Sequence, residues 1–144
     1  MLLTLIFTIV LLMKHNHNDK LYDQIVDSVV GYLQQEGFSA VKANSLPYSQ
    51  PKVVRWDEDD QGVLPDITGE YKGSLYVFEI ETGDKLKASQ VEDRWKLLSI
   101  HARRYKGKFY LVIPEPKEHA VQQVVNTLKD VQPEFLKLKG VEDA

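Results

Sequence analysis

The feature that most limits the fold is a pair of strand-like runs separated by a tight turn. Residues 63–71 and 75–81 have the composition of β-strands, and Tyr71-Lys72-Gly73-Ser74 lies between them. A glycine here favours a short hairpin, because it accepts the positive φ angle that tight turns require. The second run, Leu-Tyr-Val-Phe-Glu-Ile, is almost continuously apolar, which is typical of a strand buried on both faces. We therefore expect a central strand at 75–81, paired antiparallel with 63–71.

Helical patterns on both sides of the hairpin predict an α/β domain. Leu21, Ile25, Val29 and Leu33 recur every four residues, as in a helix with one buried face. Helices are predicted over residues 19–36, 88–105 and from Pro116 to about 128, and further strands over 38–43, 108–113 and 135–138. A long loop is expected over 44–62. The predicted order is α-β-β-β-α-β, followed by α and β, which describes a mixed central sheet flanked by helices.

The length of 144 residues fits one domain, which we place at 14–144. Residues 1–13 are apolar apart from two threonines and form a separate N-terminal appendage. They are shorter than the roughly 20 residues of a membrane-spanning helix and lack the features of a secretory signal. An appendage or a mis-assigned start is therefore favoured over a membrane anchor. We expect a cytoplasmic protein, with anchoring through residues 1–13 as the alternative.

Three acidic residues are predicted to meet at one end of the hairpin. Side chains alternate along a strand, so Glu79 and Glu81 share one face, about 7 Å apart. Antiparallel pairing around Gly73 brings Asp66, at the start of the preceding strand, to the same end of the sheet. Crowded carboxylates at the end of an apolar strand must take up protons or bind a cation. Mg²⁺ is suited to such oxygen ligands, so the sequence predicts a divalent-metal site.

The charges along the chain leave two interpretations of this region open. Net charge is only −3, which gives no general case for binding nucleic acid. Residues 57–70 are acidic, however, and residues 85–108 are strongly basic. A metal-dependent enzyme acting on a polyanion needs such an arrangement. The alternative is that both runs are solvated faces, with Glu79 and Glu81 at a frayed strand end paired to Lys85, Lys87 or Arg94.

The placement of the acidic residues resembles the PD-(D/E)xK nuclease superfamily, whose members have the restriction-endonuclease-like fold. Pro65-Asp66 is followed thirteen residues later by Glu79-Ile80-Glu81, within an α-β-β-β-α-β order that covers residues 19–113. Gln90, near the start of the next helix, also matches a residue often found in that family. One position departs from the pattern: Glu81 stands where most members have lysine, although members with glutamate there are known.

The resemblance implies a metal-dependent nuclease that hydrolyses phosphodiester bonds in DNA, with RNA as an alternative substrate. It implies Mg²⁺ or Mn²⁺ as the cofactor, and a homodimer is compatible with so small a core. The implied metal ligands are Asp66, Glu79 and the Ile80 backbone carbonyl, with Asp27 of the first helix as a further candidate. The implied catalytic residues are Asp66, Glu79, Glu81 and Gln90, and the implied nucleic-acid contacts are Lys85, Lys87, Arg94, Arg103 and Arg104. A catalytically inactive module of the same fold, binding nucleic acid or a protein, is the alternative.

Overall fold

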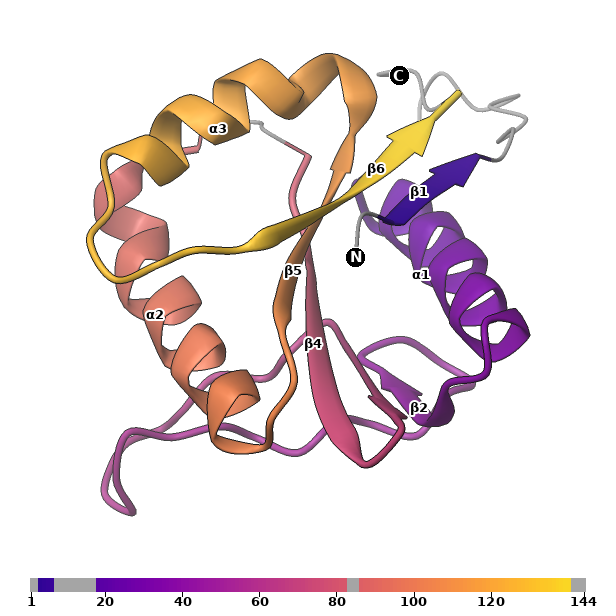
Figure 1. Ribbon diagram of the computed structural model, residues 1–144, viewed down its shortest axis with the longest axis horizontal. Coiled ribbons are helices and arrows are strands. Elements are labelled where there is room, and N and C mark those ends of the chain that lie inside the picture. Colours follow the sequence, from indigo (N-terminus) through magenta and orange to yellow (C-terminus); the bar gives the residue numbers. More distant parts are fainter. Residues whose placement is uncertain (1–2, 7–17, 83–85, 141–144) are drawn as a thin grey trace.

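A mixed β-sheet separates one helix from two others in the computed structural model, which describes residues 3–6, 18–82 and 86–140 (Figure 1). The strands lie in the order β1-β6-β5-β4-β3-β2. Their bounds are β1 Leu3–Ile6, β2 Ser39–Ala43, β3 Ile67–Tyr71, β4 Ser74–Ile80, β5 Phe109–Pro114 and β6 Glu134–Lys139. The pairs β2–β3 and β3–β4 are antiparallel, whereas β4, β5, β6 and β1 run parallel. Helix α1 (Asn18–Gln35) covers one face, and α2 (Ala88–Arg104) and α3 (Glu118–Asn126) cover the other.

The predicted α/β class is confirmed, and so is the order of its elements. Helix α1, the strands β2, β3 and β4, helix α2 and strand β5 follow one another as expected, and α3 and β6 complete the chain. The predicted strand over 63–71 begins only at Ile67, because Val63 pairs instead with Val54 in an isolated bridge. A 3₁₀ turn at Glu115–Lys117 precedes α3.

The apolar N-terminal segment contributes an edge strand that the sequence pattern does not predict. Within the described residues, Leu3–Ile6 forms β1 and pairs with β6 in the register Leu3 to Leu136. The rest of the proposed appendage, residues 1–2 and 7–13, lies outside the described part of the chain. Among the residues that the structure does describe, every helix is too short or too polar to span a membrane.

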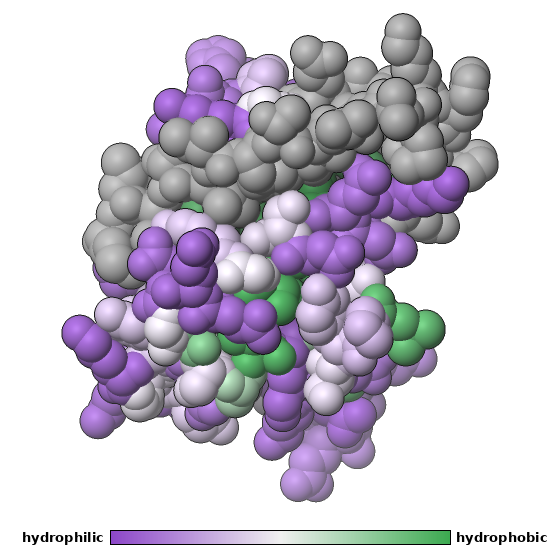
Figure 2. Space-filling view, turned by 90° about the vertical axis from the view of Figure 1, so that its right-hand side faces the viewer, coloured by the Kyte–Doolittle hydropathy of each residue, from purple (hydrophilic) through white to green (hydrophobic). Residues whose placement is uncertain are grey.

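Two apolar cores hold the helices on the sheet, and both include side chains of β4. Phe78 packs with Ile25 and Leu33 on the α1 side. Val77 packs with Trp95 and other α2 residues on the opposite side. Alternation therefore turns Glu79 toward α2, where it is only 4% exposed. In the view from the α1 side, the coloured residues are mostly hydrophilic, with small apolar patches between them (Figure 2). The apolar face of α1 is buried in the core.

The hairpin between β3 and β4 has the two-residue turn that the sequence predicts. Tyr71 pairs with Ser74, and the intervening residues Lys72 and Gly73 have φ angles of 50° and 82°. Two successive positive φ angles are the signature of a type I′ turn. The turn fixes the register, which places Ile67 opposite Phe78.

Replacing Gly73 by alanine is expected to lower the free energy of unfolding by about 1 kcal/mol, because an L side chain is strained at this positive φ. Gly31→Ala is the matched control. Gly31 is in the interior of α1, and a Cβ there meets nothing within 4 Å. This second substitution should raise stability by up to about 1 kcal/mol through helix propensity. Urea unfolding of both variants measures the difference, and equal shifts would contradict the turn geometry.

Candidate metal centre

Asp66 and Glu79 lie side by side where β3 begins and β4 ends. Ile67 pairs with Phe78; Asp66 precedes the first of these residues and Glu79 follows the second, so the two acids lie close together, as the hairpin geometry predicts. The Asp66 backbone N–H donates to Glu79 Oε1 at 2.9 Å. Asp66 Oδ2 in turn accepts a 2.8 Å hydrogen bond from the Ile80 N–H. The backbone of each strand therefore orients the carboxylate of the other.

The helices on the two faces of the sheet each add one side chain to this pair. From α1, the Tyr22 hydroxyl donates to Asp66 Oδ1 at 2.7 Å. From α2, Arg94 Nε donates to Glu79 Oε2 at 2.5 Å, and its Nη2 donates to the Leu64 carbonyl at 2.9 Å. All four carboxylate oxygens thus accept a hydrogen bond, and one guanidinium balances two acids.

Burial makes the charged forms of both acids unfavourable. Desolvation, together with the nearby charge of Asp66, raises the pKa of Glu79 to about 7 against the opposing effect of Arg94. Desolvation also raises the pKa of Asp66, although its bonds from Tyr22 and Ile80 and the charge of Arg94 act in the opposite direction. The pair therefore holds more negative charge than its surroundings neutralise. Such a pair either binds protons near neutral pH or accepts a cation.

The charges around the pair also affect its two partners. Burial and the Asp66 carboxylate raise the pKa of Tyr22, so its hydroxyl remains a hydrogen-bond donor. Burial works against the charge of Arg94, but the hydrogen bond and charge of Glu79 outweigh it and raise the pKa of this residue. Arg94 is therefore a permanent cation at the centre.

Two carboxylates come together, rather than the three that the sequence predicts. Glu81 follows the last residue of β4, and its backbone N–H donates to the Val112 carbonyl at 2.9 Å. Among the described residues, no group of three or more histidine, aspartate or glutamate side chains is placed to hold a metal ion. Any ion at this centre would need water, backbone or substrate oxygens beside Asp66 and Glu79.

Asp27, the further metal-ligand candidate on the first helix, has a different partner. Its Oδ1 accepts a 2.7 Å hydrogen bond from the Tyr48 hydroxyl. One turn earlier, Asp23 accepts a 2.8 Å hydrogen bond from Ser45. Both acids therefore tie the loop after β2 to α1, while Tyr22 is the residue of this helix that reaches Asp66.

The predicted nucleic-acid contacts are spread over different parts of the molecule. Arg94 contacts Glu79, whereas Arg103 lines a hollow near the end of α2 and Arg104 lines a smaller one beside Trp56. Lys87 is exposed at the N-cap of α2. Lys85 lies outside the described residues, and so does the side chain of Gln90, whose backbone belongs to α2.

The contact of Tyr22 with Asp66 is not predicted from the sequence, and two different roles are predicted for Arg94. Tyr22 fits the apolar stripe of α1. A tyrosine on a buried helix face needs a hydrogen-bond partner for its hydroxyl, and this requirement is the sequence feature that could have indicated a polar contact. From the sequence, Arg94 is expected either to contact a nucleic-acid phosphate or to form an ion pair with Glu79. The ion pair is present, but Glu79 is buried within β4 rather than at a frayed end.

Comparison with known proteins adds no relative to this description. No family model matches the chain, and no curated protein and no solved structure matches it. The description therefore rests on the structure, which is an α/β domain whose mixed sheet holds a buried Asp66–Glu79 pair between α1 and α2.

Proposed function

We propose that this domain is a divalent-metal-dependent nuclease of the PD-(D/E)xK type that hydrolyses phosphodiester bonds in DNA. The observation that carries the proposal is the buried Asp66–Glu79 pair, formed by adjacent antiparallel strands and incompletely neutralised by Arg94. Its position in an α-β-β-β-α-β order supports the resemblance found in the sequence.

The donor set is compatible with Mg²⁺ or Mn²⁺. Both acids offer oxygen atoms, and a carboxylate oxygen that accepts one hydrogen bond keeps a second lone pair. Mg²⁺ is commonly held by one or two carboxylates together with waters and substrate phosphates. Asp66, Glu79 and the Ile80 carbonyl would hold the ion. When bound, it would polarise the scissile phosphate and make an attacking water more acidic.

The surrounding residues would hold the acids and the substrate in place. The Tyr22 hydroxyl and the Ile80 N–H fix the orientation of the Asp66 carboxylate. Arg94 supplies, from α2, the positive charge that is missing at position 81. Its side chain is 35% exposed, so the guanidinium can exchange Glu79 for a phosphate oxygen once another cation neutralises that acid. Glu81 would orient the attacking water, and Gln90 would hold a phosphate oxygen.

Replacing Arg94 by glutamine is expected to separate ion binding from cleavage. The guanidinium repels a second cation at Glu79, so Mn²⁺ should bind roughly fivefold more tightly without it. Cleavage should fall about 100-fold, because the phosphate loses its cationic partner. Lys96→Gln is the matched control, since it removes one charge from the same helix and Lys96 is 4.0 Å from the exposed Asp130. Calorimetry and single-turnover cleavage measure the two effects, and weaker Mn²⁺ binding in Arg94→Gln would contradict the assignment.

The function is tested by metal-dependent cleavage of plasmid and branched DNA. Purified protein is incubated with Mg²⁺, Mn²⁺ or excess chelator, and Mn²⁺ binding is measured separately by calorimetry. We expect one Mn²⁺ site and cleavage that stops when the chelator is added. Absence of both the site and the cleavage would overturn the proposal.

The second candidate is an inactive module of the same fold that binds nucleic acid. Two features favour it: position 81 is glutamate, and Arg94 already forms an ion pair with Glu79. DNA binding that is unaffected by Mn²⁺, with no cleavage of any substrate, would support this alternative.

A further inference from the structure

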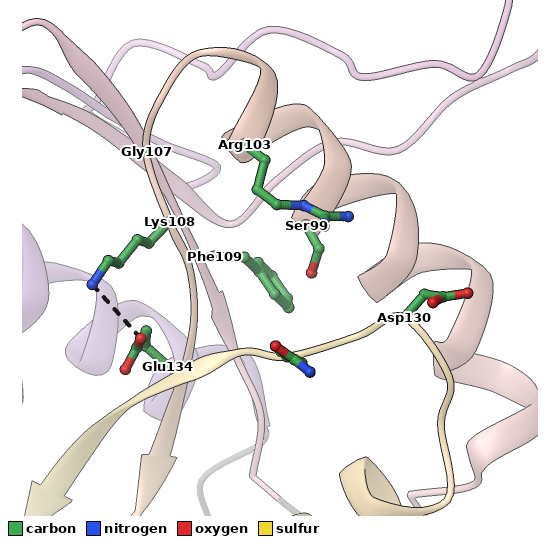
Figure 3. A pocket seen from close by; sticks show the side chains of 8 residues that line it. Ser99, Arg103, Gly107, Lys108, Phe109, Asp130 and Glu134 are labelled. Atoms are coloured by element: carbon green, nitrogen blue, oxygen red, sulfur yellow. Dashed lines mark ion pairs between the residues drawn. The ribbon is translucent and has the colours of Figure 1, made fainter.

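A hollow of about 410 Å³ opens on the face of the sheet that α2 and α3 cover (Figure 3). Its walls come from the last turns of α2, the start of β5 and the segment between α3 and β6. Phe109, at the start of β5, pairs with Val77, whereas Glu79 pairs with Leu111 further along the strands. The hollow therefore lies toward the other end of the parallel strands from the carboxylate pair. Its volume lies within the range of small-molecule sites.

Ser99 gives the hollow a polar group without a partner. The residue is 6% exposed, and its Oγ has no hydrogen-bond partner among the described residues. A buried hydroxyl is normally satisfied, so an unsatisfied one that lines a hollow points to an occupant. Figure 3 shows Ser99 and Arg103 leaving α2 on the side of the hollow, with the Phe109 ring between α2 and β5.

The charges around the hollow leave one cation uncompensated. Lys108 lies 3.7 Å from Glu134, and Asp130 lies 4.0 Å from Lys96, so these four residues form two pairs. Arg103 has no ion-pair partner in the described part of the chain. It lies four residues after Ser99, which places both side chains on one face of the helix. A guanidinium and a neighbouring hydroxyl together match the oxygens of a small anion.

We propose that this hollow, through Ser99 and Arg103, binds a phosphate monoester attached to a small organic group. The guanidinium takes two phosphate oxygens and the Ser99 hydroxyl donates to a third, while the Phe109 ring forms an apolar wall beside the organic group. The space exceeds that of a bare ion, which favours a nucleotide-sized ligand. The phosphate can come from a free mononucleotide or from the phosphorylated end of a strand.

The test measures binding to the full chain, without metal, by calorimetry and by amide chemical-shift changes. The probes are inorganic phosphate, deoxyadenosine 5′-monophosphate and one oligonucleotide with and without a 5′-phosphate. Arg103→Gln should weaken binding of the monophosphate about tenfold or more. Arg104→Gln removes the same charge from the next residue, which lines a different hollow, and should change binding less than about twofold. Equal losses in the two variants, or no binding of any probe at about 10 mM, would overturn the proposal.

Ser99→Ala tests the hydroxyl with little risk to the fold, because it removes a group that already lacks a partner. We expect binding to weaken about threefold while Tm stays the same or rises. Unchanged binding in Ser99→Ala would remove the hydroxyl from the proposal. Tighter binding of the 5′-phosphorylated oligonucleotide than of the free monophosphate would identify a strand end as the source of the phosphate. Equal binding of these two probes would identify a free nucleotide. Asp66→Asn should bind the probes normally, so failure of the nuclease function would not be mistaken for failure of this site.

Discussion

Replacing Asp66 by asparagine is expected to reduce metal-dependent cleavage of DNA by about 1,000-fold, equivalent to about 4 kcal/mol of transition-state stabilisation. The substitution removes one of two ligand charges at the proposed centre. It keeps the local hydrogen bonds, because the amide oxygen can accept from the Ile80 N–H. The amide nitrogen can then donate to the Tyr22 hydroxyl, which rotates to become the acceptor. The protein should therefore remain folded while it loses both cleavage and Mn²⁺ binding.

Asp27→Asn is the matched control for this experiment. Asp27 also accepts a 2.7 Å hydrogen bond from a tyrosine hydroxyl, that of Tyr48, but it is not among the hydrogen-bond partners of Asp66 or Glu79. Its substitution should leave cleavage within about twofold of the wild-type rate. Single-turnover rates with Mg²⁺ and calorimetric Mn²⁺ titrations compare the two variants. Full activity in Asp66→Asn would overturn the assignment of the centre, and a large loss in Asp27→Asn would restore the first-helix candidate that the sequence suggests.

The meeting of Asp66 and Glu79 is predictable from sequence because local chemistry determines it. The turn at Lys72-Gly73 fixes the register of β3 against β4, and the register alone brings the two acids together. The apolar character of β4 similarly indicates burial on both faces, which is why Glu79 is desolvated. These inferences need only the twofold alternation of a strand and the geometry of one turn.

The partners from the two helices cannot be predicted in the same way. Whether Tyr22 or Asp27 of α1 reaches Asp66 depends on how the helix is rotated and where it crosses the sheet. Helical spacing shows which face of α1 is apolar, but it does not specify which polar side chain of the helix reaches Asp66, just before β3. The pairing of Arg94 with Glu79 depends in the same way on the position of α2 over β4. Long-range packing sets both, and only the folded structure shows it.

In the metal-free protein, the free energy of unfolding should fall by about 3 kcal/mol as pH rises from 4.5 to 7. The reason is Glu79, whose pKa is raised by burial from 4.5 to about 7 in the folded protein. A raised acid pKa contributes stability that is fully present below the unfolded pKa. That stability is lost as pH rises through the folded value, because the buried carboxyl must then ionise. The raised pKa of Asp66 acts in the same direction.

Glu79→Gln isolates this effect, because glutamine fills the same space and does not titrate. The variant should lose more than half of the pH dependence, although its stability at low pH also reflects a weaker bond to Arg94. The proposed Mg²⁺ would bind the ionised form of the pair, so added Mg²⁺ should raise the Tm of the wild-type protein more at pH 8 than at pH 5 and reduce the pH dependence of its stability. Urea unfolding across this pH range, with and without Mg²⁺, measures both effects. A stability that rises from pH 4.5 to 7 without metal would mean that Arg94 alone keeps Glu79 ionised, leaving no unneutralised charge at the pair for a cation to bind.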